Sequence, residues 1–381
     1  MKPAERDSSG FTLVEMLVGM ALGLVVLSAA VMLFAKALDA TYAVSQSAEL
    51  QQNARAALDQ IARDVSLAGY GLATGGVQLP TGGTGNSIYG CDATTCYVGG
   101  QPPTGVGYPT VAAYQANPAV VNHLYGIVPG ARLGMAIVNR GVATDLLTMA
   151  YVDSTFRLDL YTVTGFGNNG TSMTLTAPNP QPTPPVPALN DAVYGLKAGD
   201  MVLLSNSNGS AIGEVSNATA TVISFGDNDW LRINQSNATA GNIKTFIQNL
   251  PPGAVTLATR ILVITYYIDV PRGPDNVLYT ADDGPPRLMR QVSGQSPMPI
   301  AENITDLQFT YDVFDENTGT ARSGLRDAGL SQVPPLSPNQ IRKVNLFVAA
   351  RSPLQNRGGY QGLQLRTSVS ARNLSFRDRY Q

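Results

Sequence analysis

Residues 10–15 have the sequence GFTLVE, and the twenty residues that follow, 16–35 (MLVGMALGLVVLSAAVMLFA), carry no charged side chain. A helix rises about 1.5 Å per residue, so this run spans about 30 Å, the thickness of the hydrocarbon core of a bilayer. The run therefore predicts a membrane-spanning helix at about residues 16–35. Glu15 lies at its start, and a carboxylate next to hydrocarbon is costly without a partner, which makes Glu15 a candidate functional residue.

A short polar leader, residues 1–10, precedes the apolar run and contains Lys2 and Arg6. A secretory signal peptide is cleaved after its apolar core. Here the boundary between polar and apolar sequence lies between Gly10 and Phe11, ahead of the core. Cleavage at this boundary would keep the apolar helix in the mature chain and would create a new N-terminus close to Glu15.

The leader, together with Gly10, Phe11 and Glu15 at this spacing, resembles the type III signal of prepilins. These are the precursors of type IV pilus subunits and of type II secretion pseudopilus subunits. The resemblance implies cleavage after Gly10 by a prepilin peptidase and N-methylation of Phe11. It also implies that Glu15 pairs with the α-amino group of Phe11 in a neighbouring subunit and sets the filament register, because two opposite charges tolerate an apolar setting only as a pair. The alternative is an ordinary signal anchor with an incidental glutamate.

Residues 11–68 contain no proline and predict one long helix. Its first half is apolar on all sides and includes Gly19 and Gly23, a spacing that permits close helix contact but is also common by chance in apolar helices. In its second half, apolar residues recur at steps of three and four: Leu50, Ala54, Leu58, Ile61 and Val65. Polar residues, Asp64 among them, are assigned to the other faces. Gly69 and Gly71 end the helix, and the amphipathic half is predicted to pack on a globular head.

The composition of the remaining chain predicts a folded, turn-rich head. Apolar residues make up 44% of the chain and charged residues 14%, and there are 38 glycines and 25 prolines, which favours a β-rich domain. The formal net charge is −2, so the chain lacks the basic footprint of a nucleic-acid partner. Arginines near the C-terminus are expected on a solvated face or on a face docked to another subunit: Arg366, Arg372, Arg377 and Arg379.

Short segments rich in β-branched and aromatic residues predict strands: 145–152, 156–163, 172–176, 201–205, 219–225 and 229–233. The strongest strand signal is at residues 258–270, which we expect at the centre of a sheet. Three further segments alternate apolar and polar residues: 306–314, 341–349 and 363–371. Their apolar faces are predicted to cover the amphipathic half of the helix, which gives an α+β fold.

The predicted organisation has four parts. Residues 1–10 form the leader and residues 11–68 the helix. Residues 69–250 form a Gly/Pro-rich and β-rich head region, and residues 251–381 a C-terminal antiparallel sheet region.

The chain has two cysteines, Cys91 and Cys96, in the sequence CDATTC. Two cysteines in a non-cytosolic domain predict a disulfide. Closing so short a ring would contribute at most about 2–3 kcal/mol. The alternative of a metal pair lacks further ligands, because His123 is the only histidine, and the redox spacing C-x-x-C is absent.

The sequence predicts a non-enzymatic protein with no cofactor. His123 is the sole histidine for a Ser-His-Asp or Cys-His set, and its apolar context favours a core or turn residue over a base. Two acidic segments, GDND (226–229) and the loop with Asp275, Asp282 and Asp283, could supply oxygen ligands to calcium. Neither has the EF-hand spacing, and Asp and Asn are also the usual turn residues, which favours turns.

Three C-terminal segments, residues 301–314 (AENITDLQFTYDVF), 341–352 (IRKVNLFVAARS) and 365–374 (LRTSVSARNL), resemble the C-terminal part of PilW-type minor pilins. The resemblance implies a subunit that primes type IV pilus assembly at or near the tip. Its implied partners are other minor pilins, the major pilin, the inner-membrane assembly platform and, as a further candidate, a tip adhesin. The implied location is the inner membrane, with the head in the periplasm, and then the pilus tip. The alternatives are a minor pseudopilin of type II secretion and a surface adhesive module.

Overall fold

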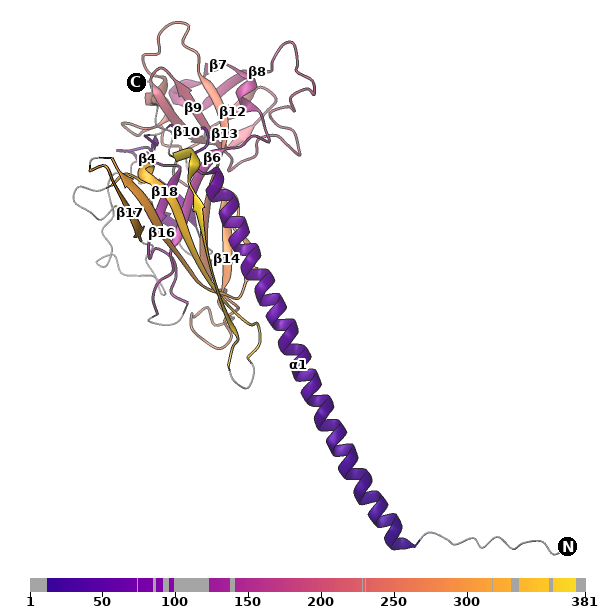
Figure 1. Cartoon of the computed structure of the whole chain (residues 1–381). Helices are drawn as coiled ribbons and strands as arrows, with labels where there is room; N and C mark the ends of the chain where they lie inside the picture. The colour runs from indigo at the N-terminus through magenta and orange to yellow at the C-terminus, as the bar shows by residue number, and fades with distance from the viewer. Residues whose placement is uncertain are drawn as a thin grey trace, which may run out of the picture.

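The computed structural model describes residues 12–73, 75–84, 87–91, 96–98, 123–137, 141–227, 229, 231–316, 318–329, 336–355 and 359–374. Within these residues the protein is one long helix attached to a head of antiparallel sheets (Figure 1). This is the predicted α+β fold.

Helix α1 (Leu13–Leu67) has 55 residues and projects from the head as a spike (Figure 1). Its N-cap residue is Thr12, and the helix is followed by Ala68 and by Gly69, whose φ of 81° lies in the left-handed region that glycine enters without strain. A Cβ on Gly69 would also lie 2.5 Å from the Leu374 side chain. The predicted helix and its glycine terminus are therefore confirmed.

A seven-stranded sheet forms the middle of the head. Its order is β10 (Gly209–Glu214), β9 (Met201–Asn206), β13 (Leu257–Asp269), β14 (Arg287–Val292) and β15 (Met298–Glu302), while β6 (Leu146–Val152) also pairs with β13, and β5 (Ile127–Gly130) pairs with β6. β13 has 13 residues and pairs with β6, β9 and β14. The strand predicted at 258–270 is thus central, as expected.

A second sheet has the order β17 (Thr320–Leu325), β16 (Ile304–Asp315), β18 (Ile341–Arg351) and β19 (Gly362–Ser370), and we call it the C-terminal sheet. Alternate residues of β16 and β18 are buried, as the sequence predicted. The buried face of β16 carries Leu307, Phe309, Tyr311 and Val313. All neighbouring strands in this sheet are antiparallel.

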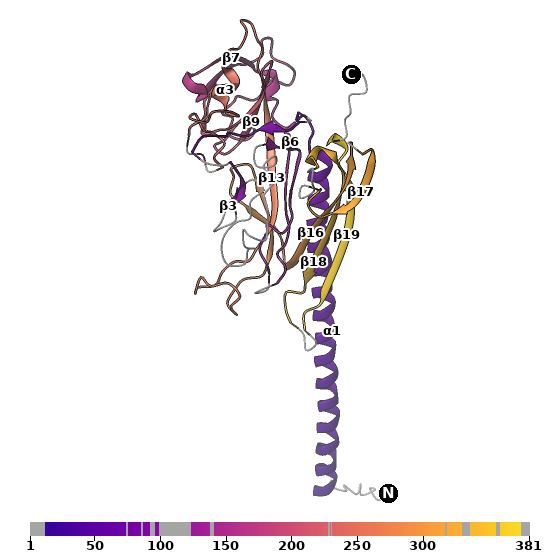
Figure 2. The same ribbon diagram turned by 90° about the vertical axis from the view of Figure 1, so that its left-hand side faces the viewer.

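A smaller sheet lies at the end of the head farthest from the start of α1 (Figure 1). It contains β11 (Asn217–Ala218), β12 (Val222–Ser224), β8 (Ser172–Thr176) and β7 (Thr162–Phe166), and the short helix α3 (Ile243–Ile247) lies near them (Figure 2). Two short ribbons complete the described strands: β1 (Val77–Gln78) with β4 (His123–Leu124), and β2 (Ile88–Cys91) with β3 (Cys96–Val98). Short 3₁₀ turns occur at Leu158–Leu160, Asn168–Gly170, Pro338–Gln340 and Arg372–Leu374.

Two predicted strands were wrong. In the segment 156–163, Leu158–Leu160 form a 3₁₀ turn in which the Tyr161 N–H donates to the Leu158 carbonyl, and only residues 162–163 belong to a strand, β7. Its apolar side chains are buried because the turn folds them back onto one core, not because they alternate along a strand. Of the segment 229–233, the described residues form a turn around Asp229, which accepts hydrogen bonds from the Ile233 and Asn234 N–H groups.

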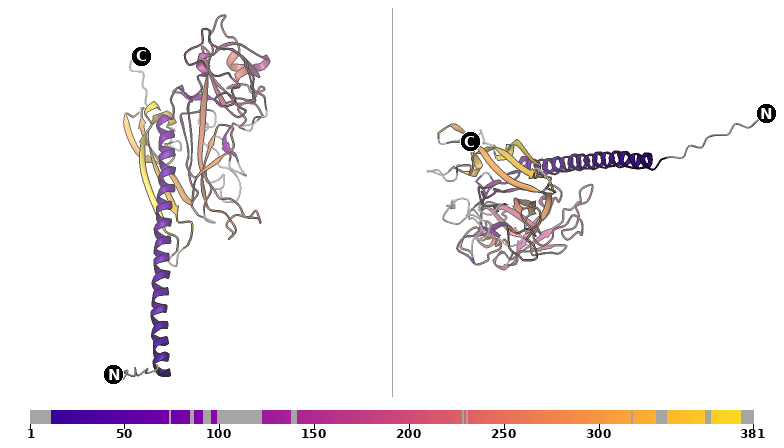
Figure 3. Two further views of the ribbon diagram at one scale, coloured as in Figure 1. Left: turned by 90° about the vertical axis from the view of Figure 1, so that its right-hand side faces the viewer. Right: turned by 90° about the horizontal axis from the view of Figure 1, so that it is seen from below.

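The main core is shared by α1 and both large sheets. It includes Leu58 and Ile61 from α1, Tyr266 from β13 and Phe309 from β16, all of them buried. Figures 2 and 3 show the second half of α1 beside the C-terminal sheet, with the sheet that contains β13 across from it. The amphipathic half of the helix is therefore an internal element of the head, as predicted.

Candidate functional site

The first part of α1, residues 13–45, lies outside the head, and we call it the free half of α1 (Figure 1). The large apolar side chains between Leu13 and Phe34 are exposed. Each of them has 53–77% of its surface accessible to solvent. Burying one such side chain contributes about 1.5–3 kcal/mol. Because α1 is long and apolar enough to cross a membrane, the free half matches a bilayer or a bundle of similar helices.

Glu15 lies at the start of the free half and closes a capping box with Thr12. The backbone N–H and the hydroxyl of Thr12 donate to Glu15 Oε2 at 3.1 and 2.9 Å, and the Glu15 N–H donates to the Thr12 hydroxyl at 3.3 Å. The Glu15 carboxylate is thus held at the N-terminal end of α1. The spacing Thr-x-x-Glu is the sequence signal of this box, and it adds Thr12 to the residues that position Glu15.

The predicted processing residues, Gly10 and Phe11, lie outside the described residues. Cleavage after Gly10 and methylation of Phe11 therefore stay predictions. The pairing of Glu15 with a neighbouring Phe11 amine also stays a prediction.

The two cysteines lie at the facing ends of β2 and β3, and the register pairs Cys91 with Cys96. Residues opposite each other in an antiparallel pair have Cα atoms about 4.5–5.5 Å apart, which is within the range that a disulfide bridges. The backbone arrangement suits the predicted disulfide, which stays a prediction.

The prediction that Asp64 lies on a polar face of α1 was wrong, because Asp64 is only 2% exposed. Its carboxylate joins α1 to three strands of the seven-stranded sheet. Tyr151 on β6 donates to Oδ1 at 3.0 Å, Tyr266 on β13 donates to Oδ2 at 2.5 Å, and the Nε of Arg290 on β14 donates to Oδ2 at 2.9 Å. We call these four residues the Asp64 network.

The Asp64 network is an internal anchor between helix and head. Burial, followed by the negative charge of Asp64, raises the pKa of both Tyr151 and Tyr266, which keeps both hydroxyls protonated as donors. The helical period could have revealed this role, because position 64 follows Ile61 by three residues and so falls on the buried stripe.

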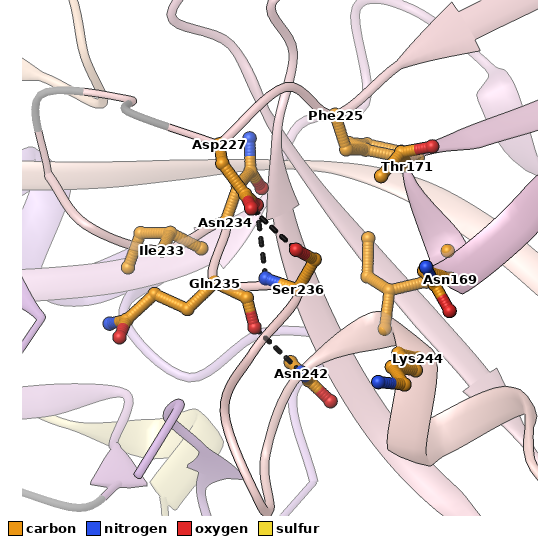
Figure 4. A pocket seen from close by; sticks show the side chains of 12 residues that line it. Asn169, Thr171, Phe225, Asp227, Ile233, Asn234, Gln235, Ser236, Asn242 and Lys244 are labelled. Atoms are coloured by element: carbon orange, nitrogen blue, oxygen red, sulfur yellow. Dashed lines mark hydrogen bonds between the residues drawn. The ribbon is translucent and has the colours of Figure 1, made fainter. Parts of the chain in front are cut away.

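The acidic segments serve as turns. Asp227 accepts from the N–H and the hydroxyl of Ser236 at 2.9 and 2.5 Å (Figure 4). In the second loop, Asp283 accepts from the N–H groups of Gly273, Tyr279 and Thr280. The cavity next to Asp227 measures about 10 Å³, which holds one water at most. These bonds support the interpretation of both segments as turns.

One acidic pair in this region is buried. Glu214, 6% exposed, adjoins Asp229, whose carboxylate already accepts two backbone N–H groups. Burial, and then the charge of Asp229, raises the pKa of Glu214 to about 8. Burial raises the pKa of Asp229 as well, so the two carboxyl groups together favour holding a proton near neutral pH.

His123 lies in β4, opposite Gln78, and its ring is 6.0 Å from the ring of Tyr125. His123 is thus a half-buried strand residue with an aromatic neighbour. The part of the chain that the structure describes holds no group of three or more His, Cys, Asp and Glu residues able to bind a metal ion.

The free half of α1, with Glu15 at its start and a β-rich head after the helix, fits the arrangement of a membrane-anchored pilin, because α1 is long and apolar enough to cross a membrane. Comparison with known families matches residues 6–31 to the prokaryotic N-terminal methylation motif. This match covers only the N-terminal part of the chain and, together with the apolar helix, supports a type IV pilin-like prepilin. No curated protein and no solved structure matched the chain.

Proposed function

We propose that this prepilin is a minor pilin that primes type IV pilus assembly and sits at or near the filament tip. The observation that carries the proposal is the free half of α1, which exposes its apolar surface on all sides while the rest of the helix is locked into the head. Such a helix can be held in the inner membrane and later transferred into the core of a filament. The head would then face the periplasm during assembly and the cell exterior afterwards.

Several features support the minor, tip-located role over that of a repeating subunit. The head is large, and the described part of α1 contains no proline, in contrast to the kink that many major pilins carry in their apolar half. A bulky head is difficult to repeat along a thin filament but can cap its end. The expected partners are the prepilin peptidase, the major pilin, other minor pilins and the inner-membrane assembly platform, with a tip adhesin as a further partner.

Within this proposal Glu15 sets the register of the incoming subunit. Thr12 holds the Glu15 carboxylate next to the N-terminal end of the helix, where a neighbouring Phe11 amine would meet it. An ion pair of this kind is favourable in an apolar filament core, whereas either charge alone is costly there.

The first test is a clean deletion of the gene, scored in parallel for surface pili and for type II exoprotein secretion. Loss of pili with intact secretion is the expected result. Loss of secretion with intact pili would instead make the protein a minor pseudopilin, which shares the same N-terminal motif. Persistence of both would contradict an assembly role and would favour a surface adhesive module.

The second test complements the deletion with Glu15→Ala. We expect the variant to be cleaved to mature size but to be missing from sheared pili, because cleavage depends on Gly10 while register depends on Glu15. The matched control is Glu49→Ala, which removes an exposed carboxylate from the same helix. Pili that contain the Glu15 variant at the wild-type level would contradict the register role.

A further inference from the structure

The outward face of the C-terminal sheet carries a groove of about 630 Å³. Its lining includes Gln308 and Thr310 from β16, Phe347 from β18, Arg366 and Ser368 from β19, and Arg326 from the segment after β17. This face is opposite the one that packs on α1, and Figure 2 shows β16, β18 and β19 side by side at this surface. We call this feature the β18 groove.

The strand register arranges the lining in two rows. Gln308 lies opposite Phe347, and Phe347 lies opposite Arg366, so these three side chains form one row across the sheet. Strands are about 4.8 Å apart, so this row is about 10 Å long. Thr310, Asn345 and Ser368 form the neighbouring row, in which Ser368 donates to Asn345 and Asn345 donates to Asp312.

Two arginines mark the ends of the first row, and internal contacts hold both in place. The guanidinium of Arg366 stacks on the Phe347 ring, 5.1 Å from its centroid. Arg326 donates a hydrogen bond to Gln308 and forms an ion pair of 3.7 Å with the buried carboxylate of Asp145, which accepts from the Phe309 N–H on β16 and is not part of the lining. Guanidinium groups that are already ordered lose less entropy when they bind an anion.

The lining residues themselves carry only positive charge, and carboxylates adjoin three of them: Asp145 pairs with Arg326, Asp306 accepts from Gln308 and Asp312 accepts from Asn345. The lining residues include two arginines and no acidic side chain. Arg366 is exposed and forms no ion pair with a carboxylate of the described residues. Because a planar guanidinium binds carboxylates through paired hydrogen bonds, the groove has the chemistry of a receptor for carboxylate groups.

We infer that the β18 groove docks an acidic segment of a partner protein. In an extended segment, two carboxylates four residues apart lie on the same side of the backbone and are separated by about 13 Å. This separation suits two arginines at the ends of the row. The neighbouring row of Thr310, Asn345 and Ser368 would meet the backbone of the segment. This inference stands on the groove alone and does not depend on the proposed role in pilus assembly.

A nucleic acid fits this face less well. Asp306 and Asp312 lie on the same outward face of β16, on either side of Gln308 and Thr310. They would repel a long polyanion that continued past the groove, whereas tight binding of a nucleic acid requires a run of cations along its backbone. A short segment laid across the sheet along the row of Gln308, Phe347 and Arg366 runs between the two aspartates, which are held by Gln308 and Asn345.

The test uses the full-length protein in detergent micelles and a displayed library of random dodecapeptides. We expect the selected peptides to be rich in Asp and Glu and their affinity to fall about ten-fold or more with Arg366→Gln, since this substitution removes the charge and the paired hydrogen bonds that a guanidinium offers a carboxylate. Ser368→Glu, which keeps Arg366 but adds a carboxylate beside it, should weaken binding as well. Arg272→Gln, a substitution in a loop outside the groove, is the matched control and should leave affinity unchanged.

Three outcomes would overturn the inference. These are selection of peptides without acidic residues, acidic binders that keep full affinity for Arg366→Gln, and failure to select any binder. A single-stranded DNA oligonucleotide is tested in parallel. Stronger binding of this DNA than of the acidic peptides, with the same loss in Arg366→Gln, would replace the acidic segment with a nucleic acid as the occupant.

Discussion

At the scale of single residues, the Asp64 network shows how one buried charge can determine the position of a whole helix. Removing one partner of a buried ion pair leaves the other uncompensated, at a cost of about 3–5 kcal/mol. Arg290 is partly exposed, with 22% of its side chain accessible, and water can solvate it after the loss of Asp64. We therefore expect Asp64→Ala to lower the free energy of unfolding by about 3 kcal/mol, the lower end of this range.

This expectation is measured by urea unfolding of the full-length protein in detergent micelles. The control is Asp59→Ala, which removes an exposed carboxylate one and a half turns earlier in α1. Equal unfolding midpoints for the two variants would mean that Asp64 contributes no more than a surface residue.

Glu214 predicts a pH dependence of stability. The ordinary pKa of a glutamate is 4.5, and in the folded protein it is raised to about 8 by burial and by the adjacent charge of Asp229. Between these values the folded state binds a proton that the unfolded state has released, so the free energy of unfolding falls as pH rises from about 4.5 to 8. The glutamine in Glu214→Gln cannot ionise. The melting temperature of this variant should therefore vary less with pH over this window than that of the wild type, and should be higher than that of the wild type at pH 8.

Melting temperatures of wild type and Glu214→Gln are compared from pH 4 to pH 9. Glu302→Gln, at an exposed site on β15, serves as the control and should keep the wild-type profile. Parallel profiles for wild type and Glu214→Gln would show that the proton on Glu214 is not linked to folding.

At the scale of elements, the helices and strands that could be predicted are those in which the pattern of apolar residues follows the burial of the side chains. The 13-residue β13 and the alternating strands β16 and β18 were found because one-sided or complete burial leaves a regular apolar pattern. The segment 156–163 was wrongly predicted as a strand because its apolar residues are also buried. Phe156, Leu158 and Tyr161 are buried by a tight turn. Asp64 was missed because its partners come from strands 87 to 226 residues away, and no local pattern contains them.

The free half of α1 also carries a prediction at this scale. Gly19 and Gly23 lie on the exposed helix, and a Cβ at either position would meet nothing within 4 Å. Leucine at both positions should therefore leave the stability of the single chain unchanged. If the glycines permit close contact between helices, the double variant should be incorporated into filaments less efficiently than wild type.

Incorporation is measured by the amount of the subunit in sheared filaments relative to the amount in the membrane. The matched control is the double alanine variant, which keeps both side chains small. Equal incorporation of the leucine and alanine variants would assign the two glycines to the ordinary composition of apolar helices.

At the scale of the whole molecule, α1 consists of two functionally different halves. Its free half makes no buried contact, since the buried residues of α1 begin at Gln46. Its second half supplies Leu50, Leu58, Ile61 and Val65 to the core between the two large sheets. Burial of these four side chains contributes roughly 6–12 kcal/mol, which is comparable to the entire stability of a typical domain.

Two truncated chains separate these contributions. A chain of residues 36–381 lacks only exposed helix, and we expect it to be soluble without detergent and to melt cooperatively. A chain of residues 69–381 loses the four core side chains and the Asp64 anchor, and should aggregate or show no cooperative transition. Gel filtration and thermal melts followed by circular dichroism distinguish the two results. A cooperative melt of the shorter chain would mean that the two sheets form a complete core by themselves, and that α1 is attached to the head without helping to hold it together.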